Sequence, residues 1–139
     1  MKYLLDSDTC ISFLKDKHRI ADKIDAVGIE NCYVSEITIA ELTYGAYHSS
    51  NFEKHIHEVK KIETLYDVVS IYSSIDYYAK EKSRLRKAGN PIPDFDLLIG
   101  TSAVVNNMKM VTSNVKHMSR IESIEIENWR DLEYNEFLK

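Results

Sequence analysis

Short apolar runs alternate along this chain with longer stretches in which apolar residues recur every three or four positions. The runs are apolar or β-branched and only a few residues long, which is typical of buried strands. We expect strands over residues 2–5, 31–34, 67–71 and 109–112. A fifth run, residues 123–126, alternates apolar and polar side chains and therefore predicts a strand at the edge of a sheet.

The longer stretches predict helices between the strands. Their expected ranges are residues 10–15, 19–26, 51–65 and 94–107, with a basic helix that begins near Ser73 or Ser74 and ends at Gly89. One more helix follows the second strand and takes Ser35 or Thr38 as its cap. Strands separated by helices imply right-handed crossovers and a mostly parallel sheet covered on both faces. The predicted fold class is α/β, a three-layer α/β/α sandwich with four or five strands.

Length and composition agree with one globular unit. A chain of 139 residues fits a single domain, residues 1–139, and can bury a core without disulfides or metal. Cys10 and Cys32 lie in apolar surroundings without metal-binding spacing, so we expect both to be reduced core residues. No apolar run approaches the roughly 20 residues of a membrane span, and the first residues do not read as a signal peptide. We therefore expect a cytoplasmic protein without a membrane partner.

The balance of charges bears on possible partners. A net charge of -4 argues against a protein whose whole surface binds nucleic acid. The basic helix nevertheless carries Lys80, Arg84 and Lys87 at spacings that share one face, which makes them candidates for RNA binding. A solvated helix face would explain the same pattern. The histidines are not needed for the chemistry, and we expect all of them, including His117, at the surface.

Candidate chemistry begins with Asp6, which ends the first apolar run and so lies at the carboxyl end of a strand. In parallel α/β sheets this edge is where ligands bind, because the strand ends fan apart and leave a crevice between loops. Thr112 and Asn114 follow the fourth strand and should reach the same edge. Thr112 could cap a helix or orient a neighbouring carboxylate, and Asn114 could form an Asx-turn or touch a ligand.

Glu41 is a second candidate, inside an otherwise apolar helical turn. If the helix begins at Thr38, Glu41 completes a capping box and only reaches back to a backbone N–H. If the helix begins at Ser35, Glu41 lies beyond the first turn and is available to a site. The sequence is compatible with both starts.

Asp94 and Asp96 open the predicted helix at residues 94–107. Acids in the first turn of a helix are favoured by its dipole and its free N–H groups, so Asp94 suits a cap. Asp96 is harder to explain in this way, because apolar residues follow it and a buried carboxylate needs a cation or hydrogen-bond donors. We therefore expect Asp96 in a site and leave Asp94 open as a ligand.

Several carboxylates at one edge repel one another unless a cation neutralises them. Oxygen ligands without His or Cys select Mg²⁺ or Mn²⁺ over zinc. Such an ion can turn a bound water into a nucleophile and offset charge on a phosphate. Hydrolysis of a phosphodiester by a metal-activated water is therefore the chemistry that Asp6, Glu41 and Asp96 suggest, with Thr112 in support.

A set of motifs in order resembles the PIN-domain ribonucleases, and within them the VapC toxins of type II toxin–antitoxin systems. The motifs are Leu4-Leu5-Asp6-Ser7-Asp8, Ala40-Glu41-Leu42-Thr43-Tyr44-Gly45, Pro91-Ile92-Pro93-Asp94-Phe95-Asp96-Leu97-Leu98-Ile99-Gly100, Val111-Thr112-Ser113-Asn114 and Ile126-Glu127-Asn128-Trp129. The resemblance covers nearly the whole chain. It implies a PIN-like fold and a Mg²⁺- or Mn²⁺-dependent endoribonuclease, inhibited by a VapB-like antitoxin and typically a homodimer.

This resemblance also assigns roles to positions of the chain. Asp6, Glu41 and Asp96 match the acids that bind metal and catalyse cleavage. Asn114 matches a fourth position that is often Asp, which makes it a weaker ligand. Asp94 is an additional acid, and the resemblance leaves its role as a metal ligand open.

Three alternatives remain. Asp6-Ser7-Asp8-Thr9 resembles part of the haloacid-dehalogenase-like phosphatase signature, which however has another residue between the second Asp and the Thr, and a later catalytic Lys. A receiver domain also gathers acids at a sheet edge, but it has an Asp after the third strand, where this chain has Ser70-Ile71-Tyr72. The non-enzymatic alternative is a PIN-like scaffold that only binds RNA or a partner, which the amide of Asn114 favours slightly.

Overall fold

Five parallel strands form one sheet in the computed structural model, which describes residues 1–139. The strands are β1 (Lys2–Leu5), β2 (Cys32–Ser35), β3 (Asp67–Val69), β4 (Met108–Val111) and β5 (Ile126–Glu127). Their order across the sheet is β3-β2-β1-β4-β5, so β1 is central, and Leu5 pairs with Val34 of β2 and Val111 of β4. Because all strands run parallel, the residues that follow them meet at one edge.

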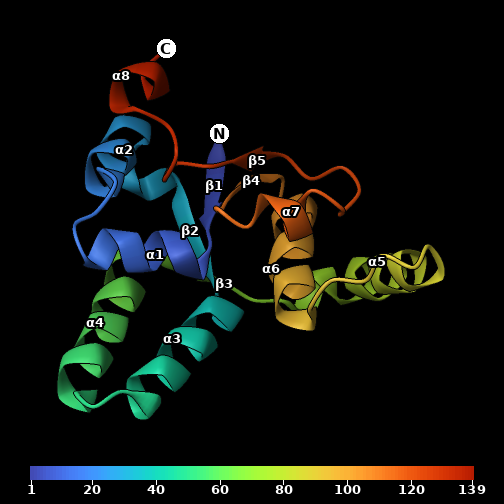
Figure 1. Cartoon of the computed structure of the whole chain (residues 1–139), viewed down its shortest axis with the longest axis horizontal. Helices are drawn as coiled ribbons and strands as arrows, with labels where there is room; N and C mark the ends of the chain where they lie inside the picture. Colours follow the sequence, from blue (N-terminus) through green and yellow to red (C-terminus); the bar gives the residue numbers. More distant parts are fainter.

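Helices connect these strands. They are α1 (Ser7–Leu14), α2 (Ile20–Val27), α3 (Glu36–His48), α4 (Phe52–Leu65), α5 (Ile75–Lys87), α6 (Asp94–Val105), α7 (Val115–Met118) and α8 (Tyr134–Phe137), with 3-10 turns η1 (Ile29–Asn31) and η2 (Tyr72–Ser74). Figure 1 shows α3 and α4 packed side by side as a hairpin that projects from the sheet. On the other side, α5 lies beyond α6.

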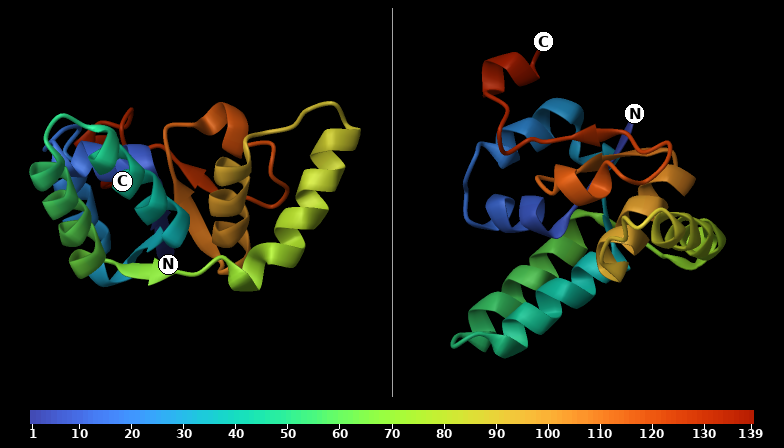
Figure 2. Two further views of the ribbon diagram at one scale, coloured as in Figure 1. Left: turned by 90° about the horizontal axis from the view of Figure 1, so that it is seen from below. Right: turned by 45° about the vertical axis from the view of Figure 1, so that its right-hand side comes forward.

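Helices cover both faces of the sheet, and each face has its own core. Leu4 of β1 belongs to a cluster with Leu85 of α5 and Leu97 of α6. Leu5, the next residue, points to the opposite face and belongs to a cluster with Ile62 of α4. Alternation of side chains along β1 thus builds three layers, which Figure 2 shows from two further directions. The predicted α/β class with a parallel sheet is confirmed.

Several element boundaries differ from the prediction. α1 begins at Ser7 rather than at residue 10, because Asp6 caps it by accepting a hydrogen bond from the Ser7 N–H. α3 begins at Glu36, with Ser35 as its cap and the N–H of Ile37 donating to the Ser35 hydroxyl. β5 has only two residues, and the four-residue helices α7 and α8 were not predicted. One helical turn contains too little periodicity to be detected in a sequence.

Both cysteines lie in the core. Cys10 and Cys32 are buried on the Leu5 side of the sheet and form no disulfide, as expected. Burial raises the pKa of both thiols, to about 12 for Cys32, so neither is a reactive thiolate near neutral pH. None of the helices has the length and apolar character that a bilayer crossing demands.

Candidate functional site

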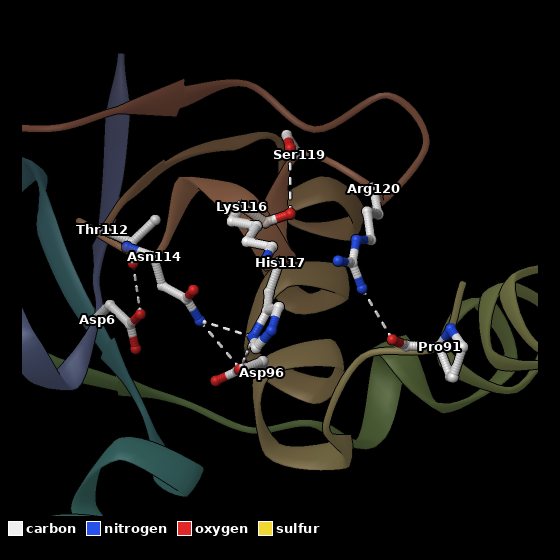
Figure 3. Close-up of polar contacts among 9 residues, drawn as sticks. All are labelled: Asp6, Pro91, Asp96, Thr112, Asn114, Lys116, His117, Ser119 and Arg120. Atoms are coloured by element: carbon white, nitrogen blue, oxygen red, sulfur yellow. Dashed lines mark hydrogen bonds and ion pairs between the residues drawn. The ribbon is translucent and has the colours of Figure 1, made fainter. Parts of the chain in front are cut away.

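The end of β1 places Asp6 at the carboxyl edge of the sheet, next to the end of β4. Asp6 is nearly buried, with 6% of its surface exposed. Its Oδ1 accepts a hydrogen bond from the Ser7 N–H (2.8 Å), and its Oδ2 accepts one from the Thr112 hydroxyl (2.7 Å; Figure 3). The Thr112 oxygen in turn accepts a hydrogen bond from the Asn114 N–H (3.0 Å). Thr112 therefore orients the Asp6 carboxylate.

Asp6 has no positively charged partner in the chain. Burial is the largest cause that raises its pKa, from 3.8 to about 7. The hydrogen bonds from Thr112 and Ser7 lower this pKa only in part, and the negative charges of Asp8 and Asp96 raise it further. A carboxylate in such surroundings favours a bound proton or an added cation.

Glu41 reaches the same edge from α3. Because Ser35 caps this helix, Glu41 lies in the second turn and does not form the capping box that Thr38 would open. Its Oε1 instead accepts a hydrogen bond from the Ser7 hydroxyl (2.7 Å). Ser7 thus binds Asp6 through its N–H and Glu41 through its hydroxyl, which brings the two acids to one place.

Asp96 arrives from the first turn of α6, with 22% of its side chain exposed. Its Oδ2 accepts a hydrogen bond from Nδ2 of Asn114 (3.0 Å) and lies 3.2 Å from Nδ1 of His117 (Figure 3). Both contacts are made at Oδ2, which leaves Oδ1 without a hydrogen bond from the chain. Asn114 occupies the cap position of α7, but its side chain does not cap that helix and contacts Asp96 instead.

His117 is not the free surface residue that the sequence predicts. Only 34% of its side chain is exposed, and its ring pairs with Asp96. The available signal was its spacing, because His117 stands three residues after Asn114 and helical side chains at that distance share a face. That signal was not recognisable without knowing that α7 exists.

Asp94 contacts α5 instead of the other acids. It is the first residue of α6, but Pro93 occupies the cap position and the Asp94 side chain does not cap the helix, so the expected cap is wrong. Its Oδ1 lies 2.9 Å from Nζ of Lys82 and accepts a hydrogen bond from the Tyr78 hydroxyl (2.9 Å). The hydrogen bond from Lys82 is the largest cause that lowers the pKa of Asp94. The structure therefore does not bring Asp94 to the candidate site.

The middle residue of the basic face of α5, Arg84, makes structural contacts within the protein. Arg84 donates two hydrogen bonds to the buried carboxylate of Glu81 (2.7 and 2.8 Å) and a third to the carbonyl of Arg120 (2.9 Å). Lys80 and Lys87 are exposed. Figure 1 shows α5 beyond α6 as seen from β1, so α6 separates the helix that carries these residues from the central strand.

A further set of contacts beside Asp6 was not predicted. Asp8 accepts hydrogen bonds from the N–H (3.0 Å) and the hydroxyl of Ser113, and Arg130 donates to the same hydroxyl (3.0 Å). Arg130 therefore ties the C-terminal segment to the carboxyl edge of the sheet. Asp8 and Arg130 lie near opposite ends of the chain, so no local pattern could have linked them.

A groove of about 480 Å³ opens beside Glu41, between α1, α3 and α4. Apolar side chains such as Leu42 line part of it. Polar and charged side chains line most of the rest: Lys15, Lys17, Lys54, His55, Glu41 and Glu58. The groove therefore places positive charge close to one of the candidate acids, although Lys15, Lys17 and Lys54 were not singled out in the sequence.

The three acids suit a hard divalent cation by their chemistry. Asp6, Glu41 and Asp96 offer only oxygen atoms, and Asp6 is a buried acid without a counter-charge. Ser7 connects Asp6 with Glu41, and Thr112 and Asn114 connect Asp6 with Asp96. No group of three or more His, Cys, Asp or Glu side chains is close enough to form a metal site. The donor types and the missing positive charge thus fit such an ion, whereas a complete set of ligands is not preformed.

A family model for the PIN domain matches residues 3–123. The chain therefore belongs to the PIN-domain family, which its motifs resembled. Within that family it belongs to the VapC ribonucleases. It is 31% identical over 132 residues to Ribonuclease VapC1 of Haemophilus influenzae strain R2866, an alignment that covers 93% of this chain and 98% of that protein.

Solved structures agree with this membership. VapBC-1 from nontypeable Haemophilus influenzae has 32% sequence identity and a TM-score of 0.82, and DNA-bound VapBC from Salmonella typhimurium has 26% and 0.86. Each alignment covers 93% of this chain and 98% of the other. The PIN-like fold is confirmed, and the phosphatase and receiver alternatives are not supported.

Proposed function

We propose that this protein is a divalent-metal-dependent endoribonuclease and the toxin of a VapBC-type toxin–antitoxin system. The observation that carries the proposal is the state of Asp6, a buried acid with a pKa of about 7 and no cation. Asp96 lies close enough to raise that pKa, and Ser7 links Asp6 to Glu41. A site of this kind gains from an ion that supplies the missing positive charge.

Asp6, Glu41 and Asp96 would hold the ion, and their oxygen atoms favour Mg²⁺ or Mn²⁺. When bound, such an ion lowers the pKa of a water and offsets the negative charge on the phosphate. Asn114 is the weaker candidate, because its amide oxygen carries no negative charge; its amide nitrogen donates to Asp96, which leaves that oxygen available.

The residues of the chain set the conditions for this chemistry. Burial keeps bulk water away from Asp6, while Thr112 and Ser7 hold its carboxylate in one orientation. Ser7 also fixes one oxygen of Glu41. The ionised acids would repel a phosphate, so the site accepts RNA only when a cation balances their charge. Metal dependence therefore follows from the burial of Asp6 and from its acidic neighbours.

The groove beside Glu41 supports a path for the RNA strand. Three lysines line it: Lys15, Lys17 and Lys54. Lysines can neutralise successive phosphates of a single strand without reading its sequence. In the patch predicted on α5, Arg84 is paired with Glu81, whereas Lys80 and Lys87 are exposed and remain available as a second contact for RNA.

A VapB-like antitoxin and a second copy of the chain are the proposed protein partners. The similar structures from Haemophilus and Salmonella are VapBC complexes. Large apolar side chains are exposed on α3, η2 and α6, among them Tyr44, Tyr47, Tyr72 and Phe95. Such exposed groups are available for protein contacts. We place the activity in the cytoplasm, where the RNA substrate is.

A PIN-like scaffold without activity is the second candidate function. The observation in its favour is the amide at Asn114, where an acid would bind metal more strongly. The argument against it is the set of acids Asp6, Glu41 and Asp96. A buried carboxylic acid without a counter-charge costs stability, and a scaffold that only binds gains nothing from it.

Incubation of the purified protein with total RNA tests the proposal. Cleavage is expected with Mg²⁺ or Mn²⁺ and not with a chelator. Asp96→Asn should lower the cleavage rate about a thousandfold, which corresponds to roughly 4 kcal/mol of transition-state stabilisation. Asp94→Asn is the matched control on the same helix and should cleave as the parent does, because Asp94 pairs with Lys82 outside the site.

Equal cleavage by the parent and Asp96→Asn would contradict this site. Binding of RNA without cleavage under every metal condition would support the scaffold instead. Mapping of the cleaved ends would identify the RNA that the enzyme prefers.

A further inference from the structure

We infer that His117 is a positioning residue for Asp96, and that the turn from Thr112 to Met118 holds two of the acids in one arrangement. The inference rests on the proposed function, because it concerns how Asp96 is prepared for a divalent cation. The proposed metal ligands are all oxygen-bearing side chains, and no histidine is among them. The starting observation is the place of the imidazole ring in the structure.

Two nitrogen atoms converge on one oxygen of Asp96. Oδ2 lies 3.0 Å from Nδ2 of Asn114 and 3.2 Å from Nδ1 of His117, and the two nitrogen atoms are 3.3 Å apart (Figure 3). With its proton on Nδ1, the ring donates to the same oxygen as the amide. Two donors on Oδ2 fix the rotation of the carboxylate and leave Oδ1 for a ligand.

The same turn also fixes the orientation of the Asp6 carboxylate. Thr112 donates to Oδ2 of Asp6, and the oxygen of Thr112 accepts a hydrogen bond from the Asn114 N–H. Asn114 therefore contacts Asp96 with its side chain and Thr112 with its backbone. A continuous set of hydrogen bonds runs from Asp6 through Thr112 and Asn114 to Asp96, and His117 closes it at the far end.

Contacts at the end of α7 and just after it hold the segment that carries the ring. Met118, the residue after His117, is fully buried. Arg120 donates to the carbonyl of Pro91 (2.9 Å), and the Arg120 carbonyl accepts a hydrogen bond from Arg84 (2.9 Å). The segment that carries His117 is thus anchored after the ring by Met118 and Arg120, and before it by Asn114, so the backbone presents the ring to Asp96.

A second histidine offers a matched control. Nδ1 of His55 in α4 lies 2.8 Å from Oε1 of Glu58, a ring–carboxylate contact of the same type. His55 and Glu58 line the groove beside Glu41, but neither is a candidate metal ligand, and the test below measures Mn²⁺ binding without RNA. Substitution of His55 removes a ring–carboxylate contact of equal chemistry without touching Asp96.

Mn²⁺ binding to the full chain without RNA, measured by titration calorimetry, tests the inference. His117→Phe keeps the ring shape without a donor and should weaken Mn²⁺ binding about tenfold or more, the usual effect of removing a partner that orients a ligand. His117→Asn should restore most of the affinity, because its amide nitrogen can take the place of Nδ1. His55→Phe should bind Mn²⁺ as the parent does. The thermal midpoint in chelator should be similar for all four proteins.

Asp96→Asn separates the two possible failures. If it loses Mn²⁺ binding while His117→Phe binds as tightly as the parent, the role of His117 is excluded and the proposed function stands. If Asp96→Asn itself binds as the parent does, the proposed metal site is wrong and the inference falls with it. Should the Phe variant fail to fold, His117→Ala makes the same comparison without added bulk.

Discussion

Two carboxylates are buried in this protein, Asp6 and Glu81, and only Glu81 has a positively charged partner. Glu81 of α5 is 1% exposed, receives two hydrogen bonds from Arg84 and accepts a third from the Glu122 N–H (2.7 Å). The hydrogen bonds from Arg84 are the largest cause that lowers its pKa. Asp6 receives only neutral donors, and burial raises its pKa to about 7.

The difference separates a structural acid from a candidate functional one. A buried charge is tolerated when the chain supplies the opposite charge and the remaining hydrogen bonds. Glu81 has both, and its network joins α5 to the segment after α7. Asp6 has hydrogen bonds but no cation in the chain, so it favours a bound proton or a cation that comes from outside the chain. Burial alone therefore does not indicate a site, whereas burial without a counter-charge makes Asp6 a candidate for one.

The largest expected effect concerns RNA cleavage. Asp6→Asn should lower the cleavage rate about a thousandfold, since the proposed ligand loses its charge. Glu81→Gln should cleave at close to the parental rate at temperatures where it remains folded, because Glu81 does not contact the acids of the site. A comparable loss of activity in the two folded variants would remove the distinction between the two acids.

The second effect is a pH dependence of stability with opposite signs for the two acids. Between about pH 4 and about pH 7, folded Asp6 keeps a proton that the unfolded chain has lost, so its contribution is full below about pH 4 and falls as the pH rises. The change from 3.8 to about 7 corresponds to at most about 4 kcal/mol. Glu81, with its lowered pKa, contributes stability above the pKa of the unfolded chain and loses it as the pH falls.

Urea unfolding in chelator from pH 4 to pH 8 measures this dependence. Asp6→Asn should abolish the fall in stability towards pH 7, and Mn²⁺ at pH 7.5 should stabilise the parent but not this variant. If the stability of the parent does not fall over this range, the pKa of folded Asp6 is not raised and the prediction is wrong.

A third effect is the cost of breaking the satisfied pair. Glu81→Gln leaves Arg84 without its charged partner and should lower the free energy of unfolding by about 2 kcal/mol, a value reduced by the partial exposure of Arg84. Lys80→Gln, one residue earlier on the exposed face, is the control and should be near neutral. Equal stabilities in chemical unfolding at pH 7 would mean that the pair contributes nothing.

The smallest effect concerns the donor to Asp6. Thr112→Val removes the hydroxyl while keeping the shape, and should cost about 1 kcal/mol of stability when Asp6 is ionised. Without that donor the pKa of Asp6 should rise further, so Mn²⁺ binding at pH 7 should weaken. Thr112→Ser retains the hydroxyl and should preserve Mn²⁺ affinity; similar losses in both variants would assign Thr112 to packing alone.

Part of the site could be predicted from the sequence because it depends on neighbouring residues. Asp6 directly follows an apolar run, and Asp96 stands in the first turn of an apolar helix. In a parallel sheet such positions converge whatever the connecting helices contain. Glu41 was ambiguous, since Ser35 and Thr38 both satisfy local capping rules, and only the observed start of α3 decided between them.

Other predicted roles were wrong because residues that look alike in the sequence contact different neighbours in the structure. Asp94 and Asp96 are two positions apart, yet one binds Lys82 and the other binds Asn114 and His117. Arg84 could have been paired with Glu81 by its helical spacing, but the burial of Glu81 could not have been foreseen. The histidine beside Asp96 was missed for a different reason, because α7 is too short to be predicted.

The sequence by itself determined the alternation of strands and helices, the parallel sheet and the acids that follow its strands. These features depend on periodicity and on residues adjacent in the chain. Only the tertiary structure decided which acid meets a cation of the chain, as Asp94 and Glu81 do, and which meets hydrogen-bond donors alone, as Asp6 does. The reason is that charge and orientation depend on what packs against a side chain, and most of those contacts join segments far apart in the sequence.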